Sequence, residues 1–539
     1  MSLFSGLYVG TTALKVASDA LNTTSHNISN ADTPGYTRQQ VSQSTRHYNI
    51  LSNATTKVAA KEIGMGVSYA ETRQVRDFFL DQVYRRESGR SAYYEVSYEA
   101  LIHVQDLLGE SGDRNFGEAI EEYWKTIQEL AGDPSSAVTQ GLFVSKAQTL
   151  IERATNVYKS LIDYQNNLNT EVKKHVDKLN VYGKRLAELN RQIVNIEVGG
   201  IEKANDLKDE RNYILDQMAD LCSISYSEDV DGYVSVQIEG VDFVKRNVFY
   251  EIGLHMDDKT GYYTPFWPHI SESSINEKGE VVYTPEEVRK GRVFNLEREI
   301  STAANTDVGR LKAVLLARGD HAADCSEMED AGEYDKKIAP SILMNIEAEF
   351  DKLISNIVQT VNGILIDTGY TDGTVGPDGK PTADSALFVR INTQGMADDE
   401  GWHIGNIAVN DAFLKEPALL NFVKGDEEVD HSAADRLKAA FEEEKYTLNP
   451  NTEKRSAFKD FYGDLVNQVS NTGSVNKLLY EYQLDTQEET NFAREQVLGV
   501  STDEELQFMI KFQNAYNVAS RYITTLNNML ESMLNQFGA

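Results

Sequence analysis

Apolar residues repeat at helical spacing at both ends of the chain, in steps that alternate between three and four. At the N-terminal end the repeat comprises Leu3, Leu7, Gly10, Leu14, Ala17, Leu21, Thr24 and Ile28. At the C-terminal end it comprises Met509, Phe512, Tyr516, Ala519, Ile523, Leu526, Leu530, Met533 and Phe537. Such spacing places each set on one stripe of a helix. We therefore predict paired, coiled-coil-like terminal helices of about 42 and 51 Å that pack antiparallel, with both chain ends at one tip.

The predicted N-terminal helix has more apolar surface than one partner helix covers. Phe4 and Tyr8 widen its apolar face, while Gly10, Ala17 and Ala20 are small enough for several helices to approach closely. Two helices with this much apolar surface should be labile alone and ordered when neighbours arrive. The pattern favours an interaction surface at the chain ends.

The pattern between the two ends predicts strands, then a helical rod, then a β-rich region. Residues 36–48 and 64–75 alternate as short strands do, and residues 91–221 are mostly helical, with a long apolar stripe from Leu161 to Ile196. From 223 to about 296 the alternation and the Gly and Asp turns predict strands. A helix is expected near 339–365, a second Gly- and Asp-rich region over 368–430, and helices over 432–444 and 454–497.

The predicted fold class is therefore mainly α with a β-rich insertion, and the domains are nested. Residues 1–33 and 504–539 form a terminal helical assembly domain. Residues 34–222 and 431–503 form a long helical rod domain, built from both chain halves, with short N-terminal strands. Residues 223–430 form a central β domain, interrupted by helix near 339–365.

The charge balance argues against two classes of partner. The chain of 539 residues has 52 Lys and Arg against 84 Asp and Glu, a net charge of −32. Broad binding to nucleic acid or to anionic lipid is therefore disfavoured. No apolar run approaches the ~18 residues of a membrane span, so we expect a soluble protein with no membrane partner. The first basic residue is Lys15 and no apolar stretch follows it, so we expect no secretory signal peptide.

No constellation of residues predicts catalysis, a cofactor or a metal. The histidines are scattered, a phosphate-binding loop is missing, and Cys222 and Cys325 match no metal or redox spacing. The run SEDVDGY, residues 227–233, resembles the start of a calcium loop, but Ile238 stands where the required Glu should be. A hairpin turn is the preferred interpretation of that run.

The sharpest local signal is NISNADTPGYTRQQ, residues 27–40. Pro34 fixes its own φ and disfavours the α region at Thr33, so the first helix must end by Thr33. Gly35 can then take the positive φ of the third position of a type II turn. Tyr36 restarts the chain as an extended segment. By local physics alone, this is a helix stop.

Together, several segments carry a more specific resemblance. SLFSGLYVGTTAL followed by SHNISNADTPGYTRQ resembles the N-terminal signature of bacterial flagellar axial proteins. Residues 64–87 and 498–534 resemble the corresponding regions of the flagellar hook-associated protein 1 family, and NIAVN (406–410) and DLVNQVSNTGS (464–474) fit it too. The resemblance covers roughly residues 1–110 and 455–539, and the middle matches mainly in organisation.

The resemblance implies a structural subunit of the hook–filament junction, with no enzymatic activity and no cofactor. It implies export through the flagellar type III channel, so that the protein is secreted to the flagellum. It further implies self-association into a ring, with hook protein on one side and a second junction or filament adaptor protein on the other. A cytoplasmic export chaperone would hold the C-terminal helix.

The expected assembly residues come from the two stripes and the turn. By analogy with the family, the turn joins the inner helix to the outer body, and the C-terminal positions form a face shared by chaperone and assembly. The set is Leu3, Leu7, Leu14, Leu21, Ile28, Asn27, Asn30, Pro34, Gly35, Tyr36, Phe512, Tyr516, Ile523, Leu526 and Leu530.

Two alternatives remain open from the sequence. The chain could be another flagellar axial subunit, a hook protein or a filament adaptor, although its long helical rod argues against hook protein. It could also be a flagellum-exported adhesin or enzyme with activity in residues 223–430, where no residues form a recognisable site.

Overall fold

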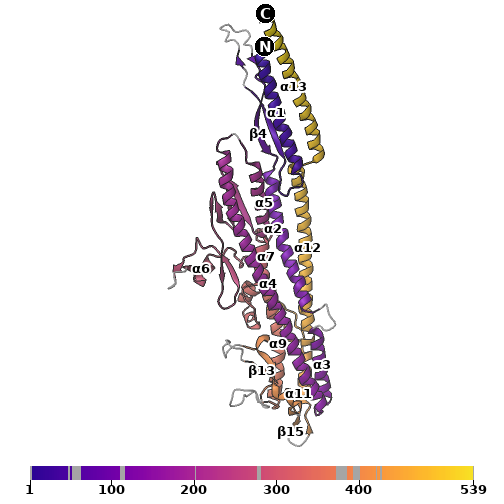
Figure 1. The fold of residues 1–539 in the computed structure, drawn as a ribbon. Helices are drawn as coiled ribbons and strands as arrows, with labels where there is room; N and C mark the ends of the chain where they lie inside the picture. Colours follow the sequence, from indigo (N-terminus) through magenta and orange to yellow (C-terminus); the bar gives the residue numbers. More distant parts are fainter. Residues whose placement is uncertain are drawn as a thin grey trace. The chain divides into compact units, whose positions relative to one another are not determined.

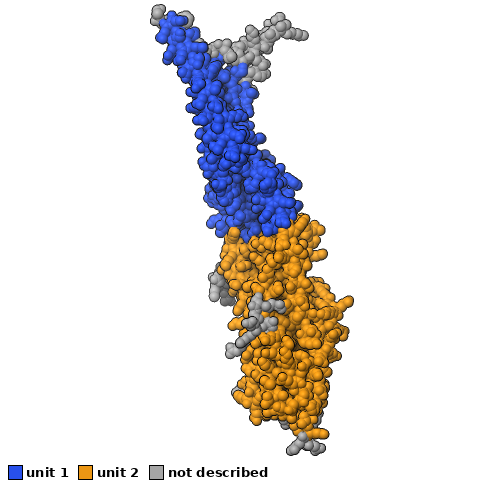
Figure 2. Space-filling view, turned by 90° about the vertical axis from the view of Figure 1, so that its right-hand side faces the viewer, with its two compact units in different colours: residues 1–89, 179–251, 484–539 blue, residues 90–178, 252–483 orange. Residues whose placement is uncertain are grey.

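The computed structural model describes residues 3–46, 49–50, 62–109, 116–200, 202–275, 281–371, 385–391, 401–420, 422–424 and 428–537. The chain divides into two compact units (Figure 2). Unit 1 comprises residues 1–89, 179–251 and 484–539, and unit 2 comprises residues 90–178 and 252–483. Each unit is therefore assembled from segments far apart in the sequence.

Long helices dominate the described residues. The α-helices are α1 (Leu3–Ser29), α2 (Phe78–Leu107), α3 (Phe116–Gly132), α4 (Ala137–Glu197), α5 (Asn205–Leu221), α6 (Pro285–Lys290), α7 (Arg310–Arg318), α8 (Ala331–Glu333), α9 (Ile342–Asp367), α10 (Asp411–Lys415), α11 (Ser432–Glu442), α12 (Phe458–Leu498) and α13 (Thr502–Phe537). Short 3₁₀ or π turns are η1 (Cys325–Met328), η2 (Tyr334–Ile338), η3 (Ile404–Asn406) and η4 (Pro417–Leu419).

The strands are short and form small antiparallel sheets. They are β1 (Gln39–Thr45), β2 (Asn49–Ile50), β3 (Glu62–Ile63), β4 (Val67–Gln74), β5 (Ile224–Glu228), β6 (Val234–Ile238), β7 (Val241–Lys245), β8 (Val248–Phe249), β9 (Gly253–Met256), β10 (Tyr263–Phe266), β11 (Ser274–Ile275), β12 (Val281–Val282), β13 (Phe388–Arg390), β14 (Ile407–Val409), β15 (Val423–Lys424) and β16 (Glu428–Val429). The largest sheet has the order β5-β6-β7-β8, and β1 pairs with β4 through a register that shifts between Ser42 and Gln43.

Unit 1 contains the terminal hairpin. Helices α1 and α13 lie side by side and antiparallel, and the two labelled chain ends lie at the same end of the pair (Figure 1). The four-stranded sheet packs on α4, where a Cβ on Gly183 would lie 2.5 Å from Phe243 Cζ. Asn190 of α4 donates to Val234 O of β6 and to Arg246 O in the turn between β7 and β8. The sheet is thereby fixed to a long helix by packing and by hydrogen bonds.

Unit 2 has an aromatic core to which both halves of the chain contribute. The ring of Phe116 lies 5.0 Å from those of Phe350 and Tyr462, so α3, α9 and α12 meet at one point. Tyr462 also donates its hydroxyl hydrogen to Leu108 O of the chain's first half. The prediction of a helical body built from both chain halves is confirmed.

The predicted fold class is confirmed, with paired terminal helices, a long helical body and a small central strand region. The stripe of α4 is buried from Leu161 to Ile193, whereas Ile196 at its end is exposed. The central region is less β-rich than expected, because α6, α7 and α10 also lie between residues 223 and 430. Most of the expected Gly- and Asp-rich stretch between 368 and 430 lies outside the described residues. The three-domain division stays a prediction.

Candidate assembly interface

The contact between α1 and α13, which we call the seam, joins small residues of α1 to large side chains of α13. Gly10 is buried, and a Cβ there would lie 2.9 Å from Ile523 Cγ1 and 3.0 Å from Tyr522 Cδ1. Gly6 is also buried, and a Cβ there would lie 3.2 Å from Leu526 Cδ1. Real Cβ atoms rarely approach so closely, so a larger residue at position 10 would force side chains of α13 to shift, and one at position 6 would crowd them.

The seam continues along α1 through other small residues, namely Ala17, Ala20 and Thr24, all of which are buried. The large residues of the predicted stripe flank the seam instead of filling it. Leu7, Leu14, Leu21 and Ile28 are half-buried, and the side chain of Leu3 lies outside the described residues. The most buried face of α1 is therefore offset from its leucines, because large side chains of α13 already occupy the space over the glycines.

The predicted stripe of α13 divides between seam and surface. Leu526 and Ala519 are buried, and three other members, Phe512, Ile523 and Leu530, are half-buried. Tyr516 remains exposed. The structure therefore brings the two stripes together along one edge, whereas part of each remains uncovered.

Large apolar side chains are exposed to solvent on both helices of the hairpin, and one of them, Tyr522, also lies against Gly10 of the seam. On α13 they are Leu506, Ile510, Val518, Tyr522, Met529, Met533 and Leu534, and on α1 they are Phe4 and Tyr8. Val518 and Leu534 are the most exposed of the α13 set, at 67% and 70%. Isolated exposed apolar residues are ordinary. Many large exposed apolar residues on two packed helices, however, are typical of a protein–protein interface.

Asn27 is the centre of a hydrogen-bond network where α1 ends. Its Nδ2 donates to Gln39 O at 2.9 Å and to Glu505 Oε2 at 3.0 Å. Its Oδ1 accepts from Gln39 N at 3.0 Å and from the Tyr36 hydroxyl at 2.8 Å. Tyr36 in turn lies 2.9 Å from His26 Nδ1. The buried amide thus makes four hydrogen bonds, two as donor and two as acceptor, which fixes the angle between α1 and β1.

The turn at Pro34 has the predicted geometry. Helix α1 ends at Ser29, before the predicted limit, and Tyr36 N donates to Thr33 O at 3.1 Å across the turn. Gly35 has a φ of +78°, which the third position of a type II turn requires. A Cβ on Gly35 would also lie 2.8 Å from Tyr213 Cβ. Pro34 and Gly35 are exposed, and Asn30 and Tyr36 are half-buried.

An ion pair joins the start of α13 to residues 27–39, which we call the elbow. The sequence did not indicate this pair. Arg38 Nε donates to Glu505 Oε1 at 2.8 Å, and Arg38 N donates to Leu498 O at 2.9 Å. Glu505 is almost fully buried. The sequence signal at Glu505 was only that of an acid favoured in the first turn of a helix. Because the partners are 467 positions apart, no local pattern joins them.

The elbow also packs against an acidic region of α5. Gln39 Nε2 donates to Asp206 Oδ1, and Gln74 Nε2 donates to Asp209 Oδ1 at 2.7 Å. Burial raises the pKa of Asp209 to about 7, although the hydrogen bonds from Thr37 act to lower this pKa. Burial, together with the nearby charges of Asp209, Asp206 and Glu505, also raises the pKa of Tyr36, so its hydroxyl stays a donor. Changes in pH are therefore expected to act on this junction through Asp209.

A buried network of charges, the ion cluster, lies farther along unit 1. It consists of three guanidinium groups and two carboxylates that alternate in space: Arg76, Asp81, Arg494, Asp216 and Arg85. It joins α2, α5 and α12 together with the segment before α2. Sequence reasoning missed this cluster, since its members are common residue types without a fixed spacing.

Among the described residues, no group of His, Cys, Asp and Glu could hold a metal ion.

The run from Ser227 to Tyr233 is the predicted hairpin turn between β5 and β6, where Gly232 has a φ of +89°. Cys222 is buried and Cys325 half-buried, and both are free thiols. Within the part of the chain that the structure describes, no helix is both long and apolar enough to cross a bilayer.

Family models match three parts of the chain. A model described as "Flagellar hook-associated protein FlgK helical domain" matches residues 101–378, which is more than half of the chain. The model "Flagella basal body rod protein" matches residues 7–37, and "Flagellar basal body rod FlgEFG protein C-terminal" matches residues 497–536. The last two ranges contain most of α1, the turn at Pro34 and nearly all of α13.

Several relatives that match over their full length share one name. The flagellar hook-associated protein 1 of Bacillus subtilis (strain 168) is 26% identical, over 100% of this chain and 99% of the relative. Those of Escherichia coli (strain K12) and Salmonella typhimurium are each 22% identical, over 97% of this chain and 98% of the relative. A solved structure, the flagellar hook junction protein FlgK from Burkholderia pseudomallei, aligns with a TM-score of 0.40 and 17% identity, over 57% of this chain and 46% of that one.

Proposed function

The chain belongs to the family of the flagellar hook-associated protein FlgK, and from that premise we propose how it is built into the flagellum. It is a structural flagellar protein of the junction between hook and filament. We propose that it assembles through the terminal hairpin, α1 with α13, and that it does so without a catalytic step.

One observation carries this proposal: the hairpin is already closed along its seam, yet it exposes large apolar side chains on its remaining surface. Covering apolar surface stabilises an assembly by roughly 25 cal/mol per Å². The hairpin segments also match models of basal body rod proteins, which supports a mode of packing shared among flagellar axial proteins. In this proposal Val518, Leu534 and Phe4 contact neighbouring subunits.

The elbow has a separate role in the proposal. Asn27, Tyr36 and the pair Arg38–Glu505 hold the hairpin at a fixed angle to β1 and to α5. Asn30, Pro34 and Gly35 supply the helix end and the turn. The seam residues of the predicted set, Leu526 and Ile523 above all, hold α13 on α1. Leu7, Leu14, Leu21 and Ile28 border the seam and are placed to contact either α13 or a neighbour.

The proposed partners follow from the position at the junction. Copies of this chain form a ring, with hook protein on one side and a second junction or filament adaptor protein on the other. The protein is secreted by type III export, and before export a cytoplasmic chaperone covers the exposed apolar side chains of α13. We further propose that residues 1–33 with 504–539, 34–222 with 431–503, and 223–430 act as the assembly, rod and outer domains.

A pair of matched double variants tests the assembly role. Val518→Asp with Leu534→Asp adds two charges at exposed apolar positions, and Asn517→Asp with Asn535→Asp adds two charges at adjacent exposed polar positions. We expect only the first variant to fail to assemble on isolated hooks and to fail to support filament growth in cells. Both should keep the helical circular dichroism of the unaltered monomer, because neither touches the seam.

Two results would contradict the proposal. Normal assembly of the Val518→Asp, Leu534→Asp variant would show that these apolar side chains do not contact neighbours. Equal failure of both variants would show that charge on α13, and not loss of apolar contact, prevents assembly.

A further inference from the structure

A small pocket in unit 2, the cationic pocket, has a charge opposite to that of the whole chain. Its volume is about 100 Å³. The described residues that line it include five cationic side chains, Arg289, Arg292, Arg318, Lys336 and Lys337, and two carboxylates, Glu297 and Asp320. The chain as a whole has a net charge of −32. A concave site lined mainly by one sign of charge concentrates its electric field, so this pocket should attract an anion.

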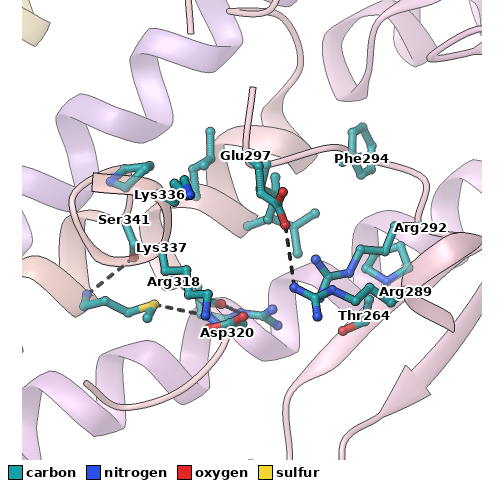
Figure 3. Close-up of a pocket in the computed structure, with 17 residues that line it drawn as sticks. Thr264, Arg289, Arg292, Phe294, Glu297, Arg318, Asp320, Lys336, Lys337 and Ser341 are labelled. Atoms are coloured by element: carbon teal, nitrogen blue, oxygen red, sulfur yellow. Dashed lines mark hydrogen bonds and ion pairs between the residues drawn. The ribbon is translucent and has the colours of Figure 1, made fainter. Parts of the chain in front are cut away.

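Apolar side chains line the pocket together with the charged ones. Phe294, Leu315, Leu316 and Met344 contribute to its lining. In Figure 3 the arginines 289 and 292 approach from one side and the lysines 336 and 337 from the other, with Arg318 and Asp320 between them. A ligand in this pocket would therefore meet cations at its polar end and hydrocarbon along its body.

Three of the five cations are already engaged. Arg318 is buried and donates to Gly319 O, Asn169 Oδ1 and Tyr263 O. Lys337 pairs with Glu333 at 2.6 Å, and Arg289 lies 3.8 Å from Glu297. Among the residues that the structure describes, Arg292 and Lys336 have no carboxylate within ion-pair distance. The charge of Arg292 helps to lower the pKa of Asp320 and that of Lys336 helps to lower the pKa of Glu333, but neither cation is held in an ion pair, so both can reach a ligand.

Arg292 and Lys336 both stand on backbone that is well fixed. The residues beside Arg292 are held to β10, since Trp267 N donates to Gly291 O at 2.8 Å and Val293 N donates to Pro265 O at 3.1 Å. Lys336 lies in η2, where Tyr334 and Ile338 are buried in an apolar cluster with Met328 and Met344. A fixed backbone restricts where both side chains can reach, which reduces the entropy lost when they bind a ligand.

We propose that the cationic pocket binds a carboxylate carried on a short apolar stem, with Arg292 and Lys336 as its donors. The carboxylate accepts hydrogen bonds from the two cations, and the stem lies against Phe294, Leu315 and Met344. A cavity of about 150 Å³ holds a benzene molecule, so about 100 Å³ suits a stem of three or four carbons. The same chemistry occurs in a free short-chain acid and in the glutamate side chain of a protein.

The binding test uses the full-length monomer and sodium butyrate, observed by saturation-transfer NMR and titration. Butyramide is the matched ligand control, because it keeps the stem and loses the charge. We expect butyrate to bind and butyramide to bind at least about tenfold more weakly, as expected for loss of charge-assisted hydrogen bonds. Binding should weaken with added salt, since Arg292 and Lys336 are not fully buried.

Variants locate the binding at this pocket. Arg292→Gln and Lys336→Gln should each weaken butyrate binding by about tenfold. Lys290→Gln is the control, because Lys290 lies two positions from Arg292 and pairs with Glu287 outside the pocket. Circular dichroism of each variant shows that it is folded. Failure of butyrate to bind, equal binding of butyramide, or equal affinity of all three variants would overturn the proposal.

A further arm separates the two sources of the carboxylate. N-acetylglutamic acid α-amide presents the glutamate side chain with blocked main-chain groups, and its glutamine counterpart is the neutral control. Tighter binding of the glutamate compound than of butyrate assigns the pocket to an acidic protein segment, and the reverse assigns it to a free acid. Because these measurements use the monomer, they are independent of whether the terminal hairpin mediates assembly.

Discussion

Arg494 donates a hydrogen bond from Nε to Asp81 Oδ1 at 2.7 Å, although 413 positions separate the two residues. Its Nη2 also reaches Asp216 Oδ2 at 2.6 Å. Burial alone would raise the pKa of Asp81, but the hydrogen bond and charge of Arg76 and the charges of Arg494 and Arg85 hold it below its ordinary value. One side chain near the end of α12 therefore joins α2 and α5 within unit 1.

We expect Arg494→Met to destabilise unit 1. Methionine keeps much of the side-chain volume but removes the cation shared by Asp81 and Asp216, which are both largely buried. Asp81 keeps Arg76 and Asp216 keeps Arg85, so the expected cost is that of the two carboxylate oxygens that lose their donor, about 1–3 kcal/mol. Urea unfolding of the monomer, followed by hydrogen exchange in α2 and α5, measures the effect.

Lys477→Met provides the control on the same helix. Lys477 pairs with Glu481 at 3.7 Å, but both side chains are more than half exposed. Exposed pairs contribute little, so the unfolding midpoint should change hardly at all. If both variants unfold at the same urea concentration, the ion cluster does not hold unit 1 together.

Gly10→Leu should open the seam. The Cβ of the new side chain would lie 2.9 Å from Ile523 Cγ1, so α13 must move away from α1. Gly141→Leu in α4 makes the same chemical change where nothing lies within 4 Å of the added Cβ. Leucine is a better helix former than glycine at both sites, by up to about 1 kcal/mol, so any difference between the variants reports packing.

Limited proteolysis with mass spectrometry distinguishes these two glycine variants. We expect α13 to be cleaved faster in Gly10→Leu and at the unaltered rate in Gly141→Leu. Unchanged cleavage of α13 in Gly10→Leu would mean that the helices can separate slightly at no cost, and that the seam does not depend on glycine.

Asn27→Asp should loosen the elbow. Asparagine donates to Gln39 O and Glu505 Oε2, whereas an ionised aspartate cannot donate and adds a negative charge beside Glu505. The expected cost is about 1–3 kcal/mol for unsatisfied buried groups. Asn30→Asp is the comparison, because Asn30 donates only to His26 O at an exposed position. Hydrogen exchange of Gln39 N and of the first turn of α13 should rise only in Asn27→Asp.

The elements that follow from short-range patterns were predictable from the sequence. Both terminal helices were expected from apolar spacing alone, and the elbow turn followed from Pro34 and Gly35, whose backbone preferences act locally. Helix α7 was not expected, since nine residues with a short apolar run do not distinguish a helix from a strand. The sequence also did not predict that the buried face of α1 is offset from its leucines. This offset depends on which side chains of α13 lie opposite each position of α1.

The polar contacts of the candidate site could not be predicted in the same way. Arg38 contacts Glu505, and Arg494 contacts Asp81 and Asp216, only because segments from both ends of the chain pack together. With 84 acidic and 52 basic residues, the number of possible pairs is far larger than the number formed. The identity of a charged residue indicates little about its partner, whereas the spacing of apolar residues directly reflects the helix period.

The final prediction concerns Asp209, whose carboxyl is buried beneath the elbow. Burial raises its pKa to about 7, from an ordinary value of 3.8 in the unfolded chain. Between these values the folded state holds a proton that the unfolded state has released. The free energy of unfolding therefore falls as the pH rises from about 4 to about 7, and this group adds no further change above that.

Asp209→Asn should remove this dependence on pH. Asparagine resembles the protonated carboxyl in having one acceptor for Gln74 and one donating group, and it does not ionise. At pH 8 we expect the variant to be more stable than the unaltered protein by at most about 4 kcal/mol, which corresponds to about three pKa units. At pH 4 the two should be almost equally stable. Urea unfolding at pH 4, 6 and 8 measures the difference, and two stability curves that stay parallel across this range would show that Asp209 is ionised in the folded protein at every pH tested.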